Sequence, residues 1–258
     1  MVHPPQLGSV RRPVRTVALV GIDGSGKTTQ AHRLADDLAA CGLPAVYRRN
    51  AGGRHWFGRL AVALGRTDAE DLLGRRLMLV VESVLRWLAI LRTLLRRTVT
   101  RELTVMDRYA VCQYASLRAH GAKRSAERRA RLAYRLFPRP DVTILLAVDP
   151  AVAYDRIEAR GYDHEEMAYL QAATDAYRSL PEYGSFVVVD ANGDMDQVAE
   201  AIRVALRAYL PEPAAAMIDH PAPRHVPASP ATIGMLVVAL GSLLAGVTAL
   251  GCQLVEAL

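Results

Sequence analysis

The chain has 258 residues, of which 51% are hydrophobic, and its formal net charge is +6. This length is sufficient for one α/β domain with additions. Cys41, Cys112 and Cys252 are far apart and form no C-x-x-C pair, which excludes a clustered zinc or dithiol motif and fits reduced thiols in a cytosolic domain. We expect no nucleic-acid partner, since the chain has no RNA-binding motif and no interleaving of aromatic and basic residues.

The amino-terminal part of the chain predicts a phosphate-binding loop. Residues 1–15 contain proline and arginine without an apolar core, so we expect a disordered basic leader rather than a signal peptide. Thr16–Val20 is typical of a buried strand, and Gln30–Ala40 has apolar residues at helical spacing. Between them, GIDGSGKTT fits the pattern G-x-x-x-x-G-K-[ST] in the strand–loop–helix context that gives this pattern its meaning. The residues of this loop that we assign to nucleotide binding are Gly21, Asp23, Gly24, Ser25, Gly26, Lys27, Thr28 and Thr29.

This loop has the chemistry that a triphosphate requires. The glycines allow successive backbone N–H groups to turn toward phosphate oxygens at a helix amino terminus, where the helix dipole also favours an anion. Lys27 would neutralise the β- and γ-phosphates, and the Thr28 hydroxyl would hold Mg²⁺. The sequence therefore predicts that the chain binds a nucleoside triphosphate.

The remaining apolar runs predict the rest of an α/β domain over residues 16–210. Strand-like runs recur at Ala45–Tyr47, Leu103–Met106, Val142–Val148 and Phe186–Val189, with helical patterns between them and a last helix near Met195–Leu210. This alternation predicts a five-stranded parallel sheet with helices on both faces and ligands at the carboxyl ends of the strands. We interpret the apolar residues at three- and four-residue spacing in Ala69–Arg97 as a packing face.

The third predicted strand is followed by Asp107, Arg108 and Tyr109. An ATPase would usually place a second carboxylate beside such an aspartate to orient water, and a GTPase would need an N-K-x-D segment; the chain has neither. An arginine beside the metal-facing aspartate suits a second phosphorylated substrate, because a guanidinium binds phosphate bidentately. The pattern thus favours phosphoryl transfer between two phosphates.

A second pair of arginines predicts a mobile lid. Arg156 and Arg160 follow the fourth predicted strand, and their spacing of four would place both on one helix face before Gly161 ends the helix. Such a lid would exclude water and offset charge in the transition state. An exposed basic face paired with Asp155 and Glu158 is the simpler interpretation of this helix taken alone.

The carboxyl-terminal part differs in composition. Residues 211–230 are rich in proline and alanine and predict an extended linker. Residues 231–252 carry no charge, and about twenty helical residues span the roughly 30 Å of a bilayer core. We expect a transmembrane helix with a short tail at 253–258, which would anchor a cytoplasmic catalytic domain to the membrane. A buried core helix and a helix for soluble oligomerisation are the alternatives.

Taken together, these motifs resemble thymidylate kinase and its close relatives. The resemblance lies in GIDGSGKTTQAHRLADDL, VMDRYAVCQYA, RPDVTILLAVDPAVAYDRIEARG and VVVDANGDMDQVAEAI, and it extends over about Arg15–Leu210. It implies that the phosphate loop holds ATP and Mg²⁺, that Asp107 organises the metal and that Arg108 bridges the two phosphates. Asn192 and Gly193 would lie near the adenine. Asp23 would face the acceptor sugar or an acceptor-binding arginine, and the family's long apolar helices imply a homodimer.

The departures from the family pattern fall on the acceptor side. The segment Arg48–Arg54 keeps arginines and glycines but loses the family's acid, and the Ala-Asp-Arg of the long helix has no clear counterpart. We assign Arg49, Arg54 and Tyr109, together with Asp23 and Arg108, to the acceptor. The first hypothesis is an ATP-dependent kinase of a nucleoside monophosphate, dTMP above all. A kinase of the same fold with another phosphorylated acceptor and an ATP-binding membrane scaffold are the other two.

Overall fold

The computed structural model describes residues 14–52, 65, 74–100, 102–161 and 164–218. The chain divides into two units, residues 1–222 and 223–258, and the second lies outside the described residues. Residues 1–13 of the predicted leader, Arg54 and the predicted membrane helix at 231–252 also lie outside them.

The five predicted strands form one parallel sheet, which confirms the α/β architecture. The strands are β1 (Thr16–Val20), β2 (Ala45–Arg49), β3 (Leu103–Asp107), β4 (Val142–Ala147) and β5 (Val187–Asp190). Their order is β2-β3-β1-β4-β5, and every neighbouring pair is parallel. Parallel strands need crossover connections, which the helices between them supply. Because β1 is central, the chain emerges from it at the middle of the carboxyl edge of the sheet.

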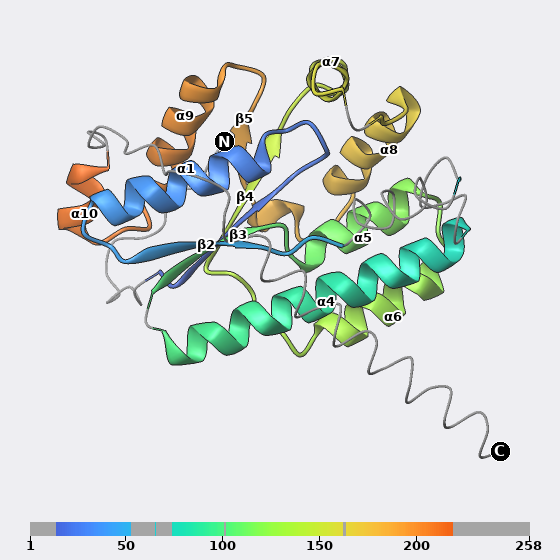
Figure 1. The fold of residues 1–258 in the computed structure, drawn as a ribbon, viewed down its shortest axis with the longest axis horizontal. Coiled ribbons are helices and arrows are strands. Elements are labelled where there is room, and N and C mark those ends of the chain that lie inside the picture. Colours follow the sequence, from blue (N-terminus) through green and yellow to red (C-terminus); the bar gives the residue numbers. More distant parts are fainter. Residues whose placement is uncertain (1–13, 53–64, 66–73, 101, 162–163, 219–258) are drawn as a thin grey trace. The chain divides into compact units, whose positions relative to one another are not determined.

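Helices cover both faces of this sheet. Figure 1 shows α1 and α9 over one face and α4, α5 and α6 over the other. The helices are α1 (Lys27–Ala40), α4 (Arg75–Val99), α5 (Ala110–Ala119), α6 (Arg124–Tyr134), α7 (Pro150–Glu158), α8 (Met167–Arg178), α9 (Met195–Arg207) and α10 (Glu212–Met217), with a 3₁₀ turn at Tyr183–Ser185.

The core lies between the sheet and these helices. All five residues of β1 and of β3 are buried, as expected for central strands of a parallel sheet. Helix α9 buries Val198, Ile202 and Leu206 against the sheet side of α1. A buried ion pair between Arg203 and Asp37, with the nitrogen 3.0 Å from the oxygen, also joins α9 to α1.

The structure refines two predictions from sequence, the packing face on α4 and the extended linker at 211–230. Most of the apolar stripe on α4 does not pack within the chain, since Leu77, Val80, Val84, Leu88 and Leu95 are each about half exposed. The face of α4 that is buried in the chain instead carries Met78, Ile90 and Arg86. The segment 211–230 is not extended throughout, because α10 forms at its start and buries Ala214 and Ala215.

The predicted membrane anchor stays a prediction. Among the helices that the described ranges contain, none combines the length and the apolar character that a membrane crossing requires.

The packing of α9 generates a stability prediction. Leu206 is fully buried, whereas Val204 on the same helix is 59% exposed. We expect Leu206→Ala to lower the free energy of unfolding by about 2–5 kcal/mol, because it removes apolar contacts and leaves a cavity. Val204→Ala should change it by less than about 0.5 kcal/mol. Urea denaturation followed by circular dichroism measures both, and equal effects would contradict this packing of α9.

Candidate active site

The phosphate loop has the left-handed backbone conformation that its glycines permit. Gly24 and Gly26 have φ of 82° and 85°, in the left-handed region that glycine adopts without steric cost. Gly26 is the residue before α1, so the loop leads directly into the amino terminus of that helix. A Cβ on Gly24 would lie 2.5 Å from the Ala153 carbonyl oxygen, so α7 packs tightly against the loop. The loop is therefore fixed from outside as well as by its own sequence.

Lys27 lies inside the loop and is 4% exposed. Its Nζ donates to the Ile22 carbonyl oxygen at 2.5 Å and lies 3.7 Å from Oδ1 of Asp23. Burial, and then the nearby Arg108, lower the pKa of Lys27 to about 8, while Asp23 and Asp107 oppose this shift. A phosphate anion beside Nζ would favour the protonated form.

Thr28 and Asp107 meet as the metal prediction requires. The Thr28 hydroxyl donates to Oδ2 of Asp107 at 2.7 Å, and the Tyr47 hydroxyl donates to the same oxygen at 3.2 Å. Oδ1 of Asp107 is buried and has no hydrogen-bond partner within the described part of the chain. A hydroxyl and a carboxylate with an unused oxygen fit Mg²⁺, which proteins bind through one or two carboxylates plus phosphates.

Arg108 has an unusual backbone conformation and a partly buried ion pair. Its φ is 74°, which costs a residue other than glycine about 1–3 kcal/mol. The Arg108 backbone amide donates to the Leu19 carbonyl at 3.0 Å, and the Arg108 backbone carbonyl accepts from the side-chain amide of Asn50 at 2.9 Å. The guanidinium donates to Asp23 of the phosphate loop. Burial lowers the pKa of Arg108, but Asp23 and Asp107 raise it well above its ordinary value. The guanidinium therefore stays charged beside the loop.

The structure reveals a polar cluster under this site that sequence reasoning missed. Arg86 of α4 is 2% exposed and donates to Oε1 of Gln113 and to Oε1 of Glu82, each at 2.5 Å. Nε of Arg86 and Nε2 of Gln113 have no partner among the described residues. Burial opposes the charge of Arg86, but Glu82 raises its pKa above the ordinary value. The one sequence feature that could have indicated this cluster is that Glu82 precedes Arg86 by four residues, on the side of the helix opposite the apolar stripe.

The cluster lies beside the segment that follows β2. A Cβ on Gly52 would lie 2.1 Å from Cγ of Glu82, so this segment passes directly over α4. Arg108 is also close enough to Arg86 to depress its pKa. The cluster thus adjoins both Arg108 and the segment predicted to contact the acceptor.

The two predicted lid arginines have different surroundings. Helix α7 ends at Glu158, so Arg160 lies beyond it and the prediction that one helix face carries both arginines was wrong. Arg160 is exposed. Arg156 donates to the carbonyl oxygens of Ala191, Asn192 and Gly193, in the loop predicted to lie near the adenine. The structure therefore brings the Arg156 guanidinium to the loop at 191–193.

The acceptor residues are only partly brought together. Arg49 pairs in register with Asp107 at the carboxyl edge of the sheet and is exposed. Tyr109 is buried, and its hydroxyl donates to the Pro138 carbonyl at 2.5 Å. This side chain therefore packs against the loop before β4, and we leave it out of the proposed site. Arg54 lies outside the described residues.

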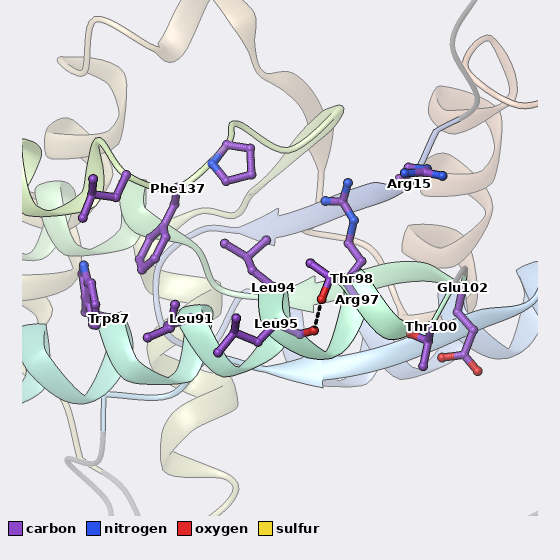
Figure 2. Close-up of a pocket in the computed structure, with 12 residues that line it drawn as sticks. Arg15, Trp87, Leu91, Leu94, Leu95, Arg97, Thr98, Thr100, Glu102 and Phe137 are labelled. Carbon is purple, nitrogen blue, oxygen red and sulfur yellow. Dashed lines mark hydrogen bonds between the residues drawn. The ribbon is translucent and has the colours of Figure 1, made fainter.

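A cavity of about 500 Å³ lies elsewhere in the domain, between α4 and the loop that follows α6. Figure 2 shows Trp87, Leu91 and Leu94 of α4 facing Phe137 across it. Its other walls include Arg15 and Glu102, which precede β1 and β3. It therefore lies toward the amino ends of the strands, whereas the phosphate loop and Asp107 are at the carboxyl ends.

Comparison with known proteins agrees with this geometry. A family model described as thymidylate kinase matches residues 19–202. A probable thymidylate kinase of Archaeoglobus fulgidus is 28% identical over 198 residues, which are 75% of this chain and 95% of that protein. A thymidylate kinase of Xanthomonas euvesicatoria pv. vesicatoria is 34% identical over 200 residues, and one of Xanthomonas oryzae pv. oryzae is 32% identical over 199. These matches cover 73% of this chain and 83% and 82% of those two proteins.

The family match covers more than half of the chain and confirms the resemblance that the motifs indicated. It spans the phosphate loop, the Asp107–Arg108 segment and the loop at Asn192. The chain is therefore a phosphotransferase, a nucleoside monophosphate kinase that belongs to the thymidylate kinase family.

Proposed function

We propose that this chain transfers the γ-phosphoryl group of ATP to dTMP, giving ADP and dTDP, with Mg²⁺ as its metal ion. The observation that carries the proposal is the convergence of Lys27 and Arg108 on Asp23, beside Thr28 and Asp107. A buried and a partly buried cation beside a metal-type carboxylate suit a reaction in which both substrates are phosphates. The names of the relatives support dTMP as the acceptor.

Each residue has a role that follows from its position. The loop amides and Lys27 would bind the β- and γ-phosphates, and Arg108 would lie between donor and acceptor. Thr28 and Asp107 would hold Mg²⁺, which supplies charge neutralisation on the transferring phosphates. No general base is required, because the acceptor phosphate is already anionic. Arg160 stays a candidate for the lid.

We also assign the acceptor phosphate to Arg86. Nε of Arg86 and Nε2 of Gln113 are donors without a partner among the described residues, and buried donors of this kind favour an acceptor such as a phosphate oxygen. Glu82, the partner of Arg86, lies against Gly52, and Arg108 is close enough to Arg86 to lower its pKa, so a phosphate bound at Arg86 would be near the transferred group.

One observation favours the second candidate, a kinase of the same fold with another phosphorylated acceptor. Asn50 stands where the family has an acid, and it is fully buried. Its side-chain nitrogen donates to the Arg108 carbonyl, and its side-chain oxygen accepts from the Thr93 hydroxyl at 3.1 Å. Both polar ends of this side chain are therefore used by the protein, and none is directed to an acceptor.

The exposed stripe on α4 supports the homodimer. Leu77, Val80, Val84, Leu88 and Leu95 lie at three- and four-residue spacing along a helix of 25 residues. An exposed apolar stripe of this length indicates an interaction surface, and a two-fold axis would pair it with the same stripe of a second copy. The membrane anchor at 231–252 remains part of the proposal as a prediction from sequence alone.

Replacing Lys27 tests the proposed function. We expect Lys27→Ala to lower kcat with ATP and dTMP by at least about a hundredfold, because charge stabilisation of the transferred group is lost. Steady-state kinetics of the full-length protein measures this loss. Circular dichroism should show an unchanged fold, and retained turnover would refute the proposal.

Replacing Arg86 tests the acceptor assignment. A lysine keeps the charge but lacks the planar, forked set of donors. Arg86→Lys should raise KM for the monophosphate by about tenfold while KM for ATP changes by less than about twofold. Arg96→Lys, at an exposed position on the same helix, is the matched control. If Arg86→Lys changes only the melting temperature, Arg86 is structural.

The dimer prediction is tested by a charge in the stripe. We expect Leu88→Glu to convert the dimer to a monomer, because a buried, unpaired carboxylate in an interface is unfavourable. Light scattering after size-exclusion chromatography measures the mass. Val204 of α9 is exposed to a similar extent as Leu88, and Val204→Glu should leave the mass unchanged. A wild-type mass equal to that of one chain would contradict the dimer.

A further inference from the structure

Arg156 makes an unusual set of contacts for a residue predicted to bind phosphate. Its Nη1 donates to the Ala191 carbonyl at 2.8 Å, and its Nη2 donates to the carbonyls of Asn192 at 3.0 Å and Gly193 at 2.7 Å. One guanidinium thus donates hydrogen bonds to three successive carbonyl oxygens. A phosphate could engage these two nitrogens only if those hydrogen bonds were replaced.

The same loop is held on its other sides. The Asn192 side chain accepts from the Asp149 amide at 2.8 Å and donates to Oδ1 of Asp190 at 2.7 Å. Asp194 and Gln197 form a capping box at the start of α9, and a Cβ on Gly193 would lie 2.5 Å from Oε1 of Gln197. The loop therefore has fixed ends, and Arg156 holds the turn between them.

Helix α7 also contacts the phosphate loop, one turn before Arg156. A Cβ on Gly24 would lie 2.5 Å from the Ala153 carbonyl oxygen, and Ala153 is fully buried. Asp149 caps this helix by accepting from the Ala151 amide at 2.8 Å. A single capped helix is thus bonded to the base-side loop and packed against the loop that cradles phosphates.

We infer that Arg156 is a positioning residue that sets the spacing between the phosphate loop and the base-side loop at 191–193, and thereby the affinity for the nucleoside part of the donor. The inference rests on the proposed function, because it takes ATP as the donor. It replaces the role of Arg156 as a lid arginine. A residue that only positions the base side affects ligands that reach both loops, and it does not affect ligands that use the phosphate loop alone.

This difference provides the test. Isothermal titration calorimetry of the full-length protein would compare ATP with inorganic tripolyphosphate, which has the phosphates but no base or ribose, both with Mg²⁺. We expect Arg156→Lys to weaken ATP binding by about tenfold, because an ammonium cannot donate to three carbonyls in this arrangement. Tripolyphosphate binding should change by less than about twofold. Arg156→Gln, which loses the charge, should give the same pattern.

The control variants distinguish the effect of the position of Arg156 from the effect of its charge. Arg178→Gln removes the same charge from an exposed position on α8 and should leave both affinities unchanged. Thermal denaturation confirms that each variant is folded. If Arg156→Gln weakens ATP and tripolyphosphate equally, Arg156 contacts phosphate and the inference is wrong. If Arg156→Lys binds ATP as the wild type does, the inference is also wrong, while wild-type protein that binds no ATP would overturn the proposed function itself.

Discussion

The parallel pairing of β1 with β3 is the constraint on which the site depends. The register places Leu19 opposite Asp107, so the phosphate loop that follows β1 and the aspartate that ends β3 reach the same edge together. In this register the Thr28 hydroxyl donates to Asp107. The amide of Arg108 extends the same pairing by bonding to Leu19, and the left-handed conformation of Arg108 then turns its side chain toward Asp23.

Charge is the second organising feature. Lys27 and Arg86 are buried cations and Arg108 is a partly buried one, and Asp23, Asp107 and Glu82 stand close to them. Buried charges persist only when they are paired, so the protein supplies its own counter-charges where two phosphorylated substrates would bring theirs. Substrate phosphates could take over from Asp23 as partners of Arg108, because a guanidinium binds phosphate as readily as carboxylate.

Local sequence signals predicted the fold and the centre of the site, and tertiary contacts decided the rest. The strands lie within two residues of their predicted bounds, because apolar runs between turn signals are local features. The contacts of Arg86 and Arg156 could not be predicted in this way. Arg86 is one of many arginines in α4, and its burial depends on α5 supplying Gln113. The hydrogen bonds of Arg156 run to a loop that begins 35 residues later in the chain, and helical spacing gives no indication of such a contact. For α4 the periodicity of the sequence predicts an apolar face, but it cannot predict which surface covers that face.

The most direct measurement of the central claim is a single-turnover reaction of the full-length protein with ATP labelled in the γ-phosphate, Mg²⁺ and dTMP. We predict that the label moves to dTDP and that little of it is released as inorganic phosphate, because the proposed site assigns Arg108 and Arg86 to an acceptor phosphate and because Arg108, not a second carboxylate, follows Asp107. Label found only in inorganic phosphate, or retained in ATP with every nucleoside monophosphate supplied, would contradict it.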